Sequence, residues 1–388
     1  ESLGGGKMKK EYYEGRTKMD WEKSGKEWLG EILPEIVRST TLGAEGRVNR
    51  YFRQGSAAAV VDEIQRLEGD YTQAHYAKLL LEKNIQPSEM ANVINKIAET
   101  IDSDYYLSTV LQNNISKLLA TPGSADAFFR ATRKIDSDYY RSVVLKEGLK
   151  KNAASPEQVK LILQSASDIS SSYYLSVVLT TLLEESETKE ESLTELINVS
   201  KNIESDYYRT EVLMKAIKKQ GLSKAAVKSA INAVADVSSD YYKTNVFNSM
   251  AEHSTMEPEM VSQVVNILDN SVGSDYYASV TMTNILKHQK LSDDAFRQLV
   301  TAAGNLGSTA YAAEVLKEAA AMNLSRTQLI DVIKAAEHID SDHYLTSVLS
   351  ELAPKVKTSD SAVKDAYRQA AKHIDSESYY GKALRQID

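Results

Sequence analysis

The chain repeats one short motif, Ser-Asp-Tyr-Tyr, at an almost constant interval. Intact copies begin at Ser103, Ser137, Ser205, Ser239 and Ser274, and a Ser-Ser-Tyr-Tyr copy begins at Ser171. Degenerate copies lie at 69–71, 308–311, 341–344 and 378–380. The column of first tyrosines falls at 71, 105, 139, 173, 207, 241, 276, 310, 343 and 379, in steps of 33 to 36 residues. Such a period is typical of architectures that stack one small supersecondary unit many times.

Each motif is expected to begin a helix. With the motif serine as position 1, apolar residues recur at positions 8, 9, 12 and 13, on the same helical face as position 4. Examples are Val144-Leu145, Val178-Leu179, Val212-Leu213, Leu182-Leu183 and Ile285-Leu286. Serine followed by aspartate suits a helix start, because the hydroxyl can accept from a free amide and the carboxylate favours the positive end of the helix dipole.

A second helix is expected in the other half of each repeat. It opens with a capping serine, as at Ser155, Ser223 and Ser292. Apolar residues then recur at helical spacing, as in Val227, Ala230, Ile231 and Val234, or in Val159, Ile162, Leu163 and Ala166. Position 6 holds a small residue in every copy from Ser108 to Thr346, which predicts close approach of a neighbouring helix.

These patterns predict an all-α protein, a right-handed α-solenoid of about nine to ten two-helix repeats of about 34 residues. The solenoid is expected over residues 69–375, with a C-terminal partial repeat or cap helix at 376–388. Residues 24–68 form a predicted atypical helical cap, because an exposed end of a stack needs a different outer face. Residues 1–23 are a short strand pair around Glu14-Gly15 or a loose arm.

The cap contains three predicted helices. Residues 24–40 place apolar residues from Trp28 to Ile36 at helical spacing, with Pro34 expected to bend the helix. Residues 44–54 and 56–67 are expected to form a shortened helix pair ahead of the first full copy.

A helical wheel separates the two tyrosines of the motif. The second tyrosine falls on the apolar face and is expected in the repeat core, with its hydroxyl directed to a backbone group or to water at the rim. This set comprises Tyr106, Tyr140, Tyr174, Tyr208, Tyr242 and Tyr277, continued by Tyr311 and Tyr344.

The first tyrosine falls on the polar face, where two interpretations remain open. It packs against the preceding hairpin, or it belongs to a regularly spaced row of rings that binds a partner, since tyrosine offers a large rigid contact at low entropic cost. The candidate partner-binding residues are Tyr105, Tyr139, Tyr173, Tyr207, Tyr241 and Tyr276. Ala310 and His343 interrupt this row.

Composition and motifs argue against several functions. A net charge of −8 disfavours nucleic acid, no apolar run is long enough to span a membrane, and the absence of cysteine excludes disulfides and thiolate metal sites. The six histidines lack zinc-ligand spacing, and no phosphate loop, dinucleotide fingerprint or nucleophile elbow occurs. Asp-Ser-Asp runs such as 102–104 lack the rest of a calcium loop, and helix capping accounts for them. We therefore expect no enzyme activity, no metal and no cofactor.

The motif Ser-Asp-Tyr-Tyr-x-Ser/Thr-x-Val-Leu, with its lead-in from Trp28 to Glu35, resembles a bacterial helical-repeat region of envelope proteins. Some of those proteins carry elsewhere a zinc metallopeptidase related to beta-lactam sensors. The resemblance covers residues about 17–388 and implies a bacterial, extracytoplasmic protein. It transfers no catalytic residue, because the peptidase motif is not in this sequence. The general shape is similar to HEAT and tetratricopeptide solenoids, without their signature residues.

The function expected from these features is a non-enzymatic scaffold that binds a protein or peptide, or a copy of itself, along an extended surface. The alternative is a structural protein whose solenoids assemble into a filament or shell through contacts between unlike ends. Carbohydrate capture on aromatic rows is a third possibility, which the scarcity of tryptophan disfavours. The chain starts at Glu1, so we expect it to be a mature or excised piece of a longer protein.

Overall fold

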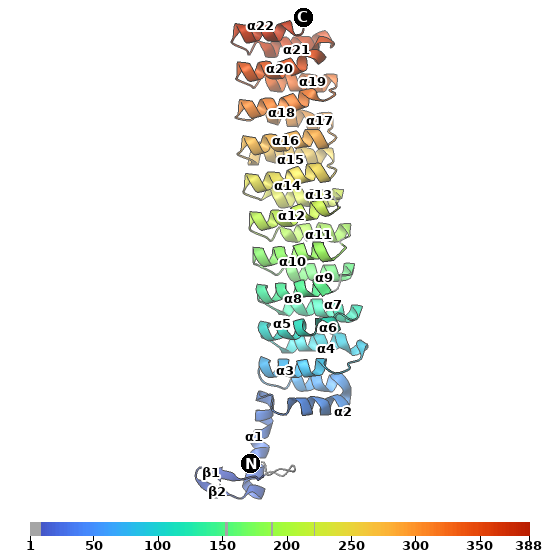
Figure 1. Ribbon diagram of the computed structural model, residues 1–388, viewed down its shortest axis with the longest axis vertical. Helices are drawn as coiled ribbons and strands as arrows, with labels where there is room; N and C mark the ends of the chain where they lie inside the picture. Colours follow the sequence, from blue (N-terminus) through green and yellow to red (C-terminus); the bar gives the residue numbers. More distant parts are fainter. Residues whose placement is uncertain (1–8, 152–153, 188, 221) are drawn as a thin grey trace. The chain divides into compact units, whose positions relative to one another are not determined.

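The computed structural model describes residues 9–151, 154–187, 189–220 and 222–388, and they form two compact units (Figure 1). The first unit is Glu1–Ile169 and the second is Ser170–Asp388. The described residues are almost entirely helical, and one two-stranded sheet lies near the N-terminus. The prediction of an all-α solenoid is therefore confirmed, with each unit a stack of helical hairpins.

Two kinds of helix alternate along the chain in both units. We call the helix that opens with the tyrosine motif the motif helix, and the one that follows it the return helix. In the first unit the motif helices are α3 (Asp70–Leu81), α5 (Asp104–Asn113) continued by α6 (Ile115–Leu118), and α8 (Asp138–Lys151). Its return helices are α4 (Pro87–Thr100), α7 (Pro122–Ala131) followed by the 3₁₀ turn η2 (Thr132–Lys134), and α9 (Pro156–Ala166).

The second unit repeats the same hairpin with little variation. Its motif helices are α10 (Ser172–Glu185), α12 (Asp206–Gln220), α14 (Asp240–His253), α16 (Asp275–His288), α18 (Thr309–Ala321), α20 (Asp342–Lys357) and α22 (Glu377–Arg385). Its return helices are α11 (Glu190–Ser200), α13 (Lys224–Ala235), α15 (Pro258–Ser271), α17 (Asp293–Gly304), α19 (Arg326–Ala336) and α21 (Ser361–Ala371).

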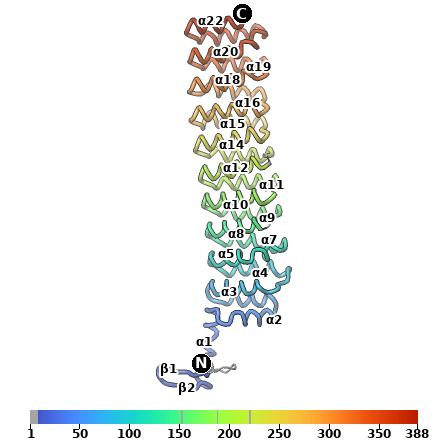
Figure 2. The backbone as a smooth tube through the Cα atoms, in the orientation of Figure 1, coloured from blue at the N-terminus to red at the C-terminus, as the bar shows by residue number. Residues whose placement is uncertain are grey.

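Within each unit the helices form two layers. Motif helices pack on motif helices and return helices on return helices, as in the runs α10–α12–α14 and α11–α13–α15. Successive hairpins follow in chain order, which is plain in the tube view of the second unit (Figure 2). The layers are thus built from contacts between residues about one repeat apart.

The core lies between the two layers, at the positions that the periodicity predicts. Val178, Leu179 and Leu182 of α10 are fully buried, as are the matching Val212, Leu213 and Ala216 of α12. The return helices contribute the predicted sets that begin at Val159 and Val227, each buried to within 1% exposure. Position 6 is also buried, and the Ser108 hydroxyl donates to the Tyr105 carbonyl at 2.9 Å. Small side chains there let neighbouring helices approach closely, as expected.

The capping serines of the return helices are confirmed. Ser155 and Ser325 form capping boxes with the glutamines three residues on, and Ser223 and Ser292 accept from backbone amides in the first turn. Motif serines cap less consistently. Ser239 accepts from the Tyr242 amide at 3.5 Å, whereas Ser103 makes no side-chain cap bond.

The N-terminal segment contains the predicted strand pair rather than a loose arm. Strands β1 (Tyr12–Glu14) and β2 (Thr17–Met19) pair antiparallel, with Gly15 at φ 61° in the turn between them. A π-helix, η1 (Trp21–Gly25), leads into α1 (Lys26–Ser39), which continues through Pro34. Residues 1–8 of the predicted arm lie outside the described residues.

Helix α2 (Ala44–Ile64) is the predicted shortened pair, joined by a kink at Gly55 and Ser56. Ser56 has φ 61°, a conformation that costs a residue with a side chain about 1–3 kcal/mol. Its hydroxyl donates to both carboxylate oxygens of Glu89 on α4, at 2.8 and 2.9 Å. The bond to the next return helix offsets part of this strain.

The aspartate at position 2 of the motif links most repeats to the next. Asp104 accepts from the Asp136 and Ser137 amides at 2.9 and 2.7 Å, and Asp206 accepts from the Ser238 and Ser239 amides at 3.0 and 2.9 Å. The same bond recurs from Asp70, Asp240, Asp275 and Asp342 to the backbone amides just before the following motif helix. We call this contact the inter-repeat clasp. Helix capping within one repeat, which the sequence suggests for these aspartates, is not their main bond.

Serine replaces aspartate in the clasp of the Ser-Ser-Tyr-Tyr copy. The Ser172 hydroxyl accepts from the Glu204 and Ser205 amides, at 3.1 and 3.2 Å. A neutral acceptor of similar reach can therefore make the clasp, although hydrogen bonds to a charged acceptor are stronger.

The opposite end of several motif helices, α3, α10, α14 and α18, is bonded by a side chain of the following repeat. The Lys117 ammonium donates to the Leu81 and Lys83 carbonyls, and Lys355 donates to the Ala320 carbonyl at 2.7 Å. The Gln289 amide plays this part in another copy, with bonds of 2.6 and 2.9 Å to the Ala251 and Ser254 carbonyls. Cations are favourable here because carbonyls at a helix C-terminus lack helical partners. Burial lowers the pKa of Lys117.

We expect Asp206→Ala to lower the free energy of unfolding by about 1–3 kcal/mol, because the backbone amides of Ser238 and Ser239 lose their acceptor. Asp206→Ser should cost less, since Ser172 makes the same two bonds. Asp236→Ala, at an exposed carboxylate one turn from the clasp, serves as the control. Urea denaturation followed by circular dichroism measures all three, and equal stability of Asp206→Ala and wild type would contradict the role of the clasp.

Candidate functional site

The tyrosines of successive motif helices form a continuous ladder of ring contacts within each unit. The two rings of one motif lie 5.0–5.3 Å apart between centroids, as in Tyr139–Tyr140 and Tyr276–Tyr277. The first tyrosine of one repeat then contacts the second tyrosine of the next, at 6.0 Å in Tyr105–Tyr140 and 5.6 Å in Tyr173–Tyr208. Ring planes cross at about 60°, near the edge-to-face geometry that aromatic pairs prefer.

The ladder contains two uninterrupted stretches, one per unit. In the first unit the ring contacts run Tyr71, Tyr106, Tyr105, Tyr140, Tyr139. In the second unit they run Tyr174, Tyr173, Tyr208, Tyr207, Tyr242, Tyr241, Tyr277, Tyr276, Tyr311. Each link joins either two residues of one motif or two adjacent repeats, so the ladder follows directly from the register of the hairpins.

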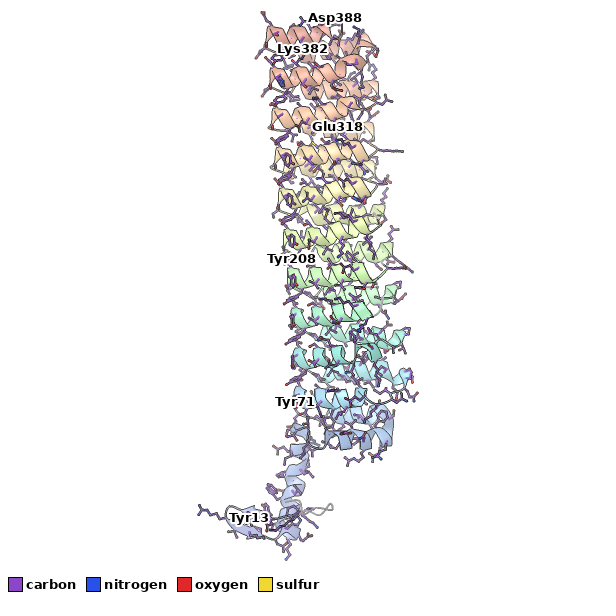
Figure 3. The ribbon with its side chains drawn as sticks, in the orientation of Figure 1. Tyr13, Tyr71, Tyr208, Glu318, Lys382 and Asp388 are labelled. Atoms are coloured by element: carbon purple, nitrogen blue, oxygen red, sulfur yellow. The ribbon has the colours of Figure 1, made fainter. Side chains whose placement is uncertain are left out.

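The first tyrosines expose about half of their surface. The exposed fraction lies between 45% for Tyr207 and 53% for Tyr105, and Tyr71 reaches 59%. Figure 3 shows Tyr71 at the edge of the first unit, where its motif helices begin. Each ring packs on a neighbour and still faces solvent, so partner binding stays a prediction. The packing partner is the following repeat rather than the expected preceding hairpin.

The second tyrosines are half-buried and lie at the rim of the core. Tyr106, Tyr140, Tyr174, Tyr208, Tyr242 and Tyr277 all fall in this class, and Tyr344 is 36% exposed. The helical wheel places them on the core face but ignores depth along the helix axis. They stand in the first turn, where the hairpin ends, so their neighbours are other tyrosine rings. The fully buried tyrosines are others, Tyr76 and Tyr367.

The ladder stops where the sequence lacks a ring. Position 3 is Ala310 in α18, and in the described part of the chain no ring contact joins Tyr311 to Tyr344. Beyond the gap His343 continues the pattern, with ring contacts to Tyr344 at 5.1 Å and Tyr379 at 6.2 Å.

These contacts also correct the register of the last copy. The clasp from Asp342 reaches the Ser376 amide at 2.9 Å, so Ser376 is position 1. Tyr379 is then the second-tyrosine position, and it contacts His343 as a second tyrosine does. The sequence pattern instead predicts Tyr379 as a first tyrosine, because the pair Tyr379-Tyr380 imitates the motif one residue late.

One tyrosine of the ladder has a perturbed acidity. The Glu211 carboxylate, one helical turn along α12, raises the pKa of the Tyr207 phenol by charge repulsion and by a hydrogen bond. The phenol therefore stays protonated and neutral over the physiological range.

A groove of about 230 Å³ lies between α3 and α5 in the first unit. Its wall combines rings, aliphatic groups and amides, contributed by Tyr71, Ala74, His75, Lys78, Tyr105, Tyr106, Thr109, Val110, Asn113 and Asn114.

Buried cations occupy position 5 of some motifs, one residue after the second tyrosine, and the sequence pattern does not predict them. Arg209 is 8% exposed and donates to the Ile203 carbonyl at 2.8 Å and the Lys201 carbonyl at 3.1 Å. Arg141 and Lys243 make equivalent bonds to return-helix carbonyls. These side chains satisfy helix ends inside the stack, so they are structural. Leucine fills the same position in other copies, which hides the pattern.

The described residues contain no group of three metal-ligating side chains, and none of the helices they form is long and apolar enough to cross a membrane. The acidic and tyrosine residues are instead distributed along the stack, one set per repeat.

Comparison with known proteins assigns no family. No family model matches the chain, and no curated protein matches it. A solved circular tandem repeat protein, with a novel repeat topology and enhanced subunit contact surfaces, is 12% identical over 95% of this chain and 79% of its own, with a TM-score of 0.17. A structure from the computational design of self-assembling cyclic homooligomers is 13% identical over 93% of this chain and 97% of its own, with a TM-score of 0.11. At these TM-scores neither structure carries an argument about this chain.

We expect Ala310→Tyr to stabilise the second unit by about 0.5–1.5 kcal/mol, because a ring at this position would rejoin Tyr311 and Tyr344. Ala310→Leu is the matched control, since it adds apolar area without an aromatic edge. Unfolding by urea gives both values. If the leucine variant gains as much as the tyrosine variant, ring geometry contributes nothing specific to the ladder.

Proposed function

We propose that this protein is a non-enzymatic scaffold that binds a protein or peptide partner along the exposed tyrosines of its repeats. The observation that carries the proposal is the row of half-exposed first tyrosines within each unit, at Tyr71, Tyr105 and Tyr139 in the first and at Tyr173, Tyr207, Tyr241 and Tyr276 in the second. Rigid aromatic anchors dominate the binding energy of many protein interfaces.

The geometry supports an extended partner. Tyr173, Tyr207 and Tyr241 stand in equivalent places on successive motif helices, whose axes are separated by about 8–10 Å in packed helices. Three residues of a polyproline II chain cover about 9 Å and return to the same face of that chain. A partner laid along the row in this form can therefore contact one ring with every third residue.

The ladder also prepares the surface for binding. Each exposed ring is held by contacts to two neighbouring rings, as Tyr207 is by Tyr208 and Tyr242. Less side-chain entropy is lost when a partner contacts a ring that is already fixed. The resemblance of the motif to repeat regions of bacterial envelope proteins supports a bacterial, extracytoplasmic setting for this scaffold.

Self-assembly is the second candidate, favoured by one observation in the first unit. Helix α1 buries none of its residues, and Trp28 and Leu33 are each 42% exposed. An amphipathic helix normally packs its apolar face against another element of the fold. The exposed apolar face of α1 is therefore a candidate contact to another chain. Light scattering over a range of protein concentrations tests this candidate, and a mass that stays constant would exclude it.

To test the proposal we would select peptides from an unbiased display library against the wild-type protein and measure their affinities. Changing Tyr173, Tyr207 and Tyr241 together to alanine should weaken the selected peptides about tenfold or more, with helix content unchanged. The matching triple change to phenylalanine keeps the rings and should retain most of the affinity. Equal binding by the alanine variant, or a library that yields no binder, would contradict the proposal.

A further inference from the structure

In the first unit an exposed carboxylate comes three residues before each exposed first tyrosine. These residues are Glu68, Asp102 and Asp136, at the N-terminal end of the motif helix. Among the described residues, none of the three carboxylates makes a hydrogen bond or an ion pair. Together with Tyr71, Tyr105 and Tyr139 they make a strip of three ring–carboxylate pairs, which we call the acidic tyrosine strip.

Further carboxylates lie along the strip. Asp70 and Asp104 accept from backbone amides in the clasp. Among the nearby cations, Arg133 pairs with Asp168 at 3.5 Å, and Arg38 and Arg66 are exposed near Glu68, whose amide donates to the Arg38 carbonyl.

A further cation, Lys78, lines the groove between α3 and α5. It lies seven residues after Tyr71 on α3, about 10 Å along the helix axis. That separation is about one Debye length at physiological ionic strength, so most of the effect of Lys78 on the carboxylates is screened.

The second unit provides an internal comparison. The residue three places before the first tyrosine is Ser170, Ser238 or Gly273 in three of its copies, and only Glu204 repeats the carboxylate next to a tyrosine. The rings are therefore common to both units, while the regular pairing of ring with carboxylate belongs to the first.

We infer that the acidic tyrosine strip binds an extended basic segment of a partner protein, with a lysine or arginine at about every third residue. A cation over the face of a tyrosine is attracted by the ring, and the carboxylate beside it supplies the opposite charge. The repeat spacing of about 8–10 Å matches three residues of a polyproline II chain, which bring every third side chain to the same face, so successive cations meet successive pairs. This inference rests on the proposed function and names the chemistry of its partner.

The test uses fluorescence anisotropy with the full chain and labelled 18-residue peptides. The first peptide repeats Arg-Ala-Ser, the second repeats Glu-Ala-Ser, and a third has the same number of arginines gathered at one end. We expect the first peptide to bind about tenfold more tightly than the third and the second not to bind, with affinity falling as salt rises.

Two matched variants locate the site. Glu68→Gln, Asp102→Asn and Asp136→Asn combined should weaken the first peptide about tenfold. Glu45→Gln, Asp62→Asn and Glu82→Gln make the same change in net charge at exposed carboxylates away from the strip, and should have little effect. Circular dichroism confirms that both variants keep their helix content.

The outcomes separate this inference from the proposed function. If library-selected peptides bind through the tyrosines but are not basic, or the strip variant binds the arginine peptide as wild type does, the inference is overturned and the proposed function stands. If the arginine peptide binds the control variant as weakly as the strip variant, the attraction is one of net charge and the inference is also overturned. If no peptide depends on the tyrosines, both fail.

Discussion

The structure depends on a set of backbone amides whose hydrogen-bond acceptor is a side chain of the preceding repeat. The amides just before a motif helix lie where no helical carbonyl can accept from them, and the position 2 side chain of the preceding repeat accepts from them instead. Because this side chain has a short reach, it fixes the offset between two hairpins to within one residue. The lysine or glutamine at the far end of the motif helix fixes the other end in the same way. A hydrophobic interface alone would tolerate sliding, whereas these two bonds define one register.

The tyrosine ladder is a consequence of that register. With successive motif helices held in phase, the first tyrosine of one repeat comes to lie edge-on to the second tyrosine of the next. Both rings stand in the first helical turn, so neither can enter the core, and the chain leaves a regular aromatic surface on its solvent side. A residue pair that stabilises the stack thereby also forms the surface that we propose for binding. Stability and recognition are coupled in the same side chains, and replacing a first tyrosine should affect both.

Much of the fold could be predicted from the sequence because the repeat is nearly exact. The constant period, the apolar positions 8, 9, 12 and 13, and the serine caps such as Ser155 indicate each helix and its buried face. The candidate site was harder to predict. A helical wheel gives direction but not depth, so it placed Tyr106 and its equivalents inside the core. The partners of Asp104 and Asp206 lie about one repeat away in sequence, so nothing local distinguishes a clasp from an ordinary cap. Arg209 was missed because arginine alternates with leucine at its position.

The clasp is tested most directly by residue-specific amide hydrogen exchange on the unmodified protein. The account predicts that the amides of Ser137, Ser239 and Ser274 exchange at least about a hundredfold more slowly than in an unstructured peptide, although they lie just outside their own helices. Exchange of these amides at the rate of an unstructured chain, with the helix interiors still protected, would contradict it.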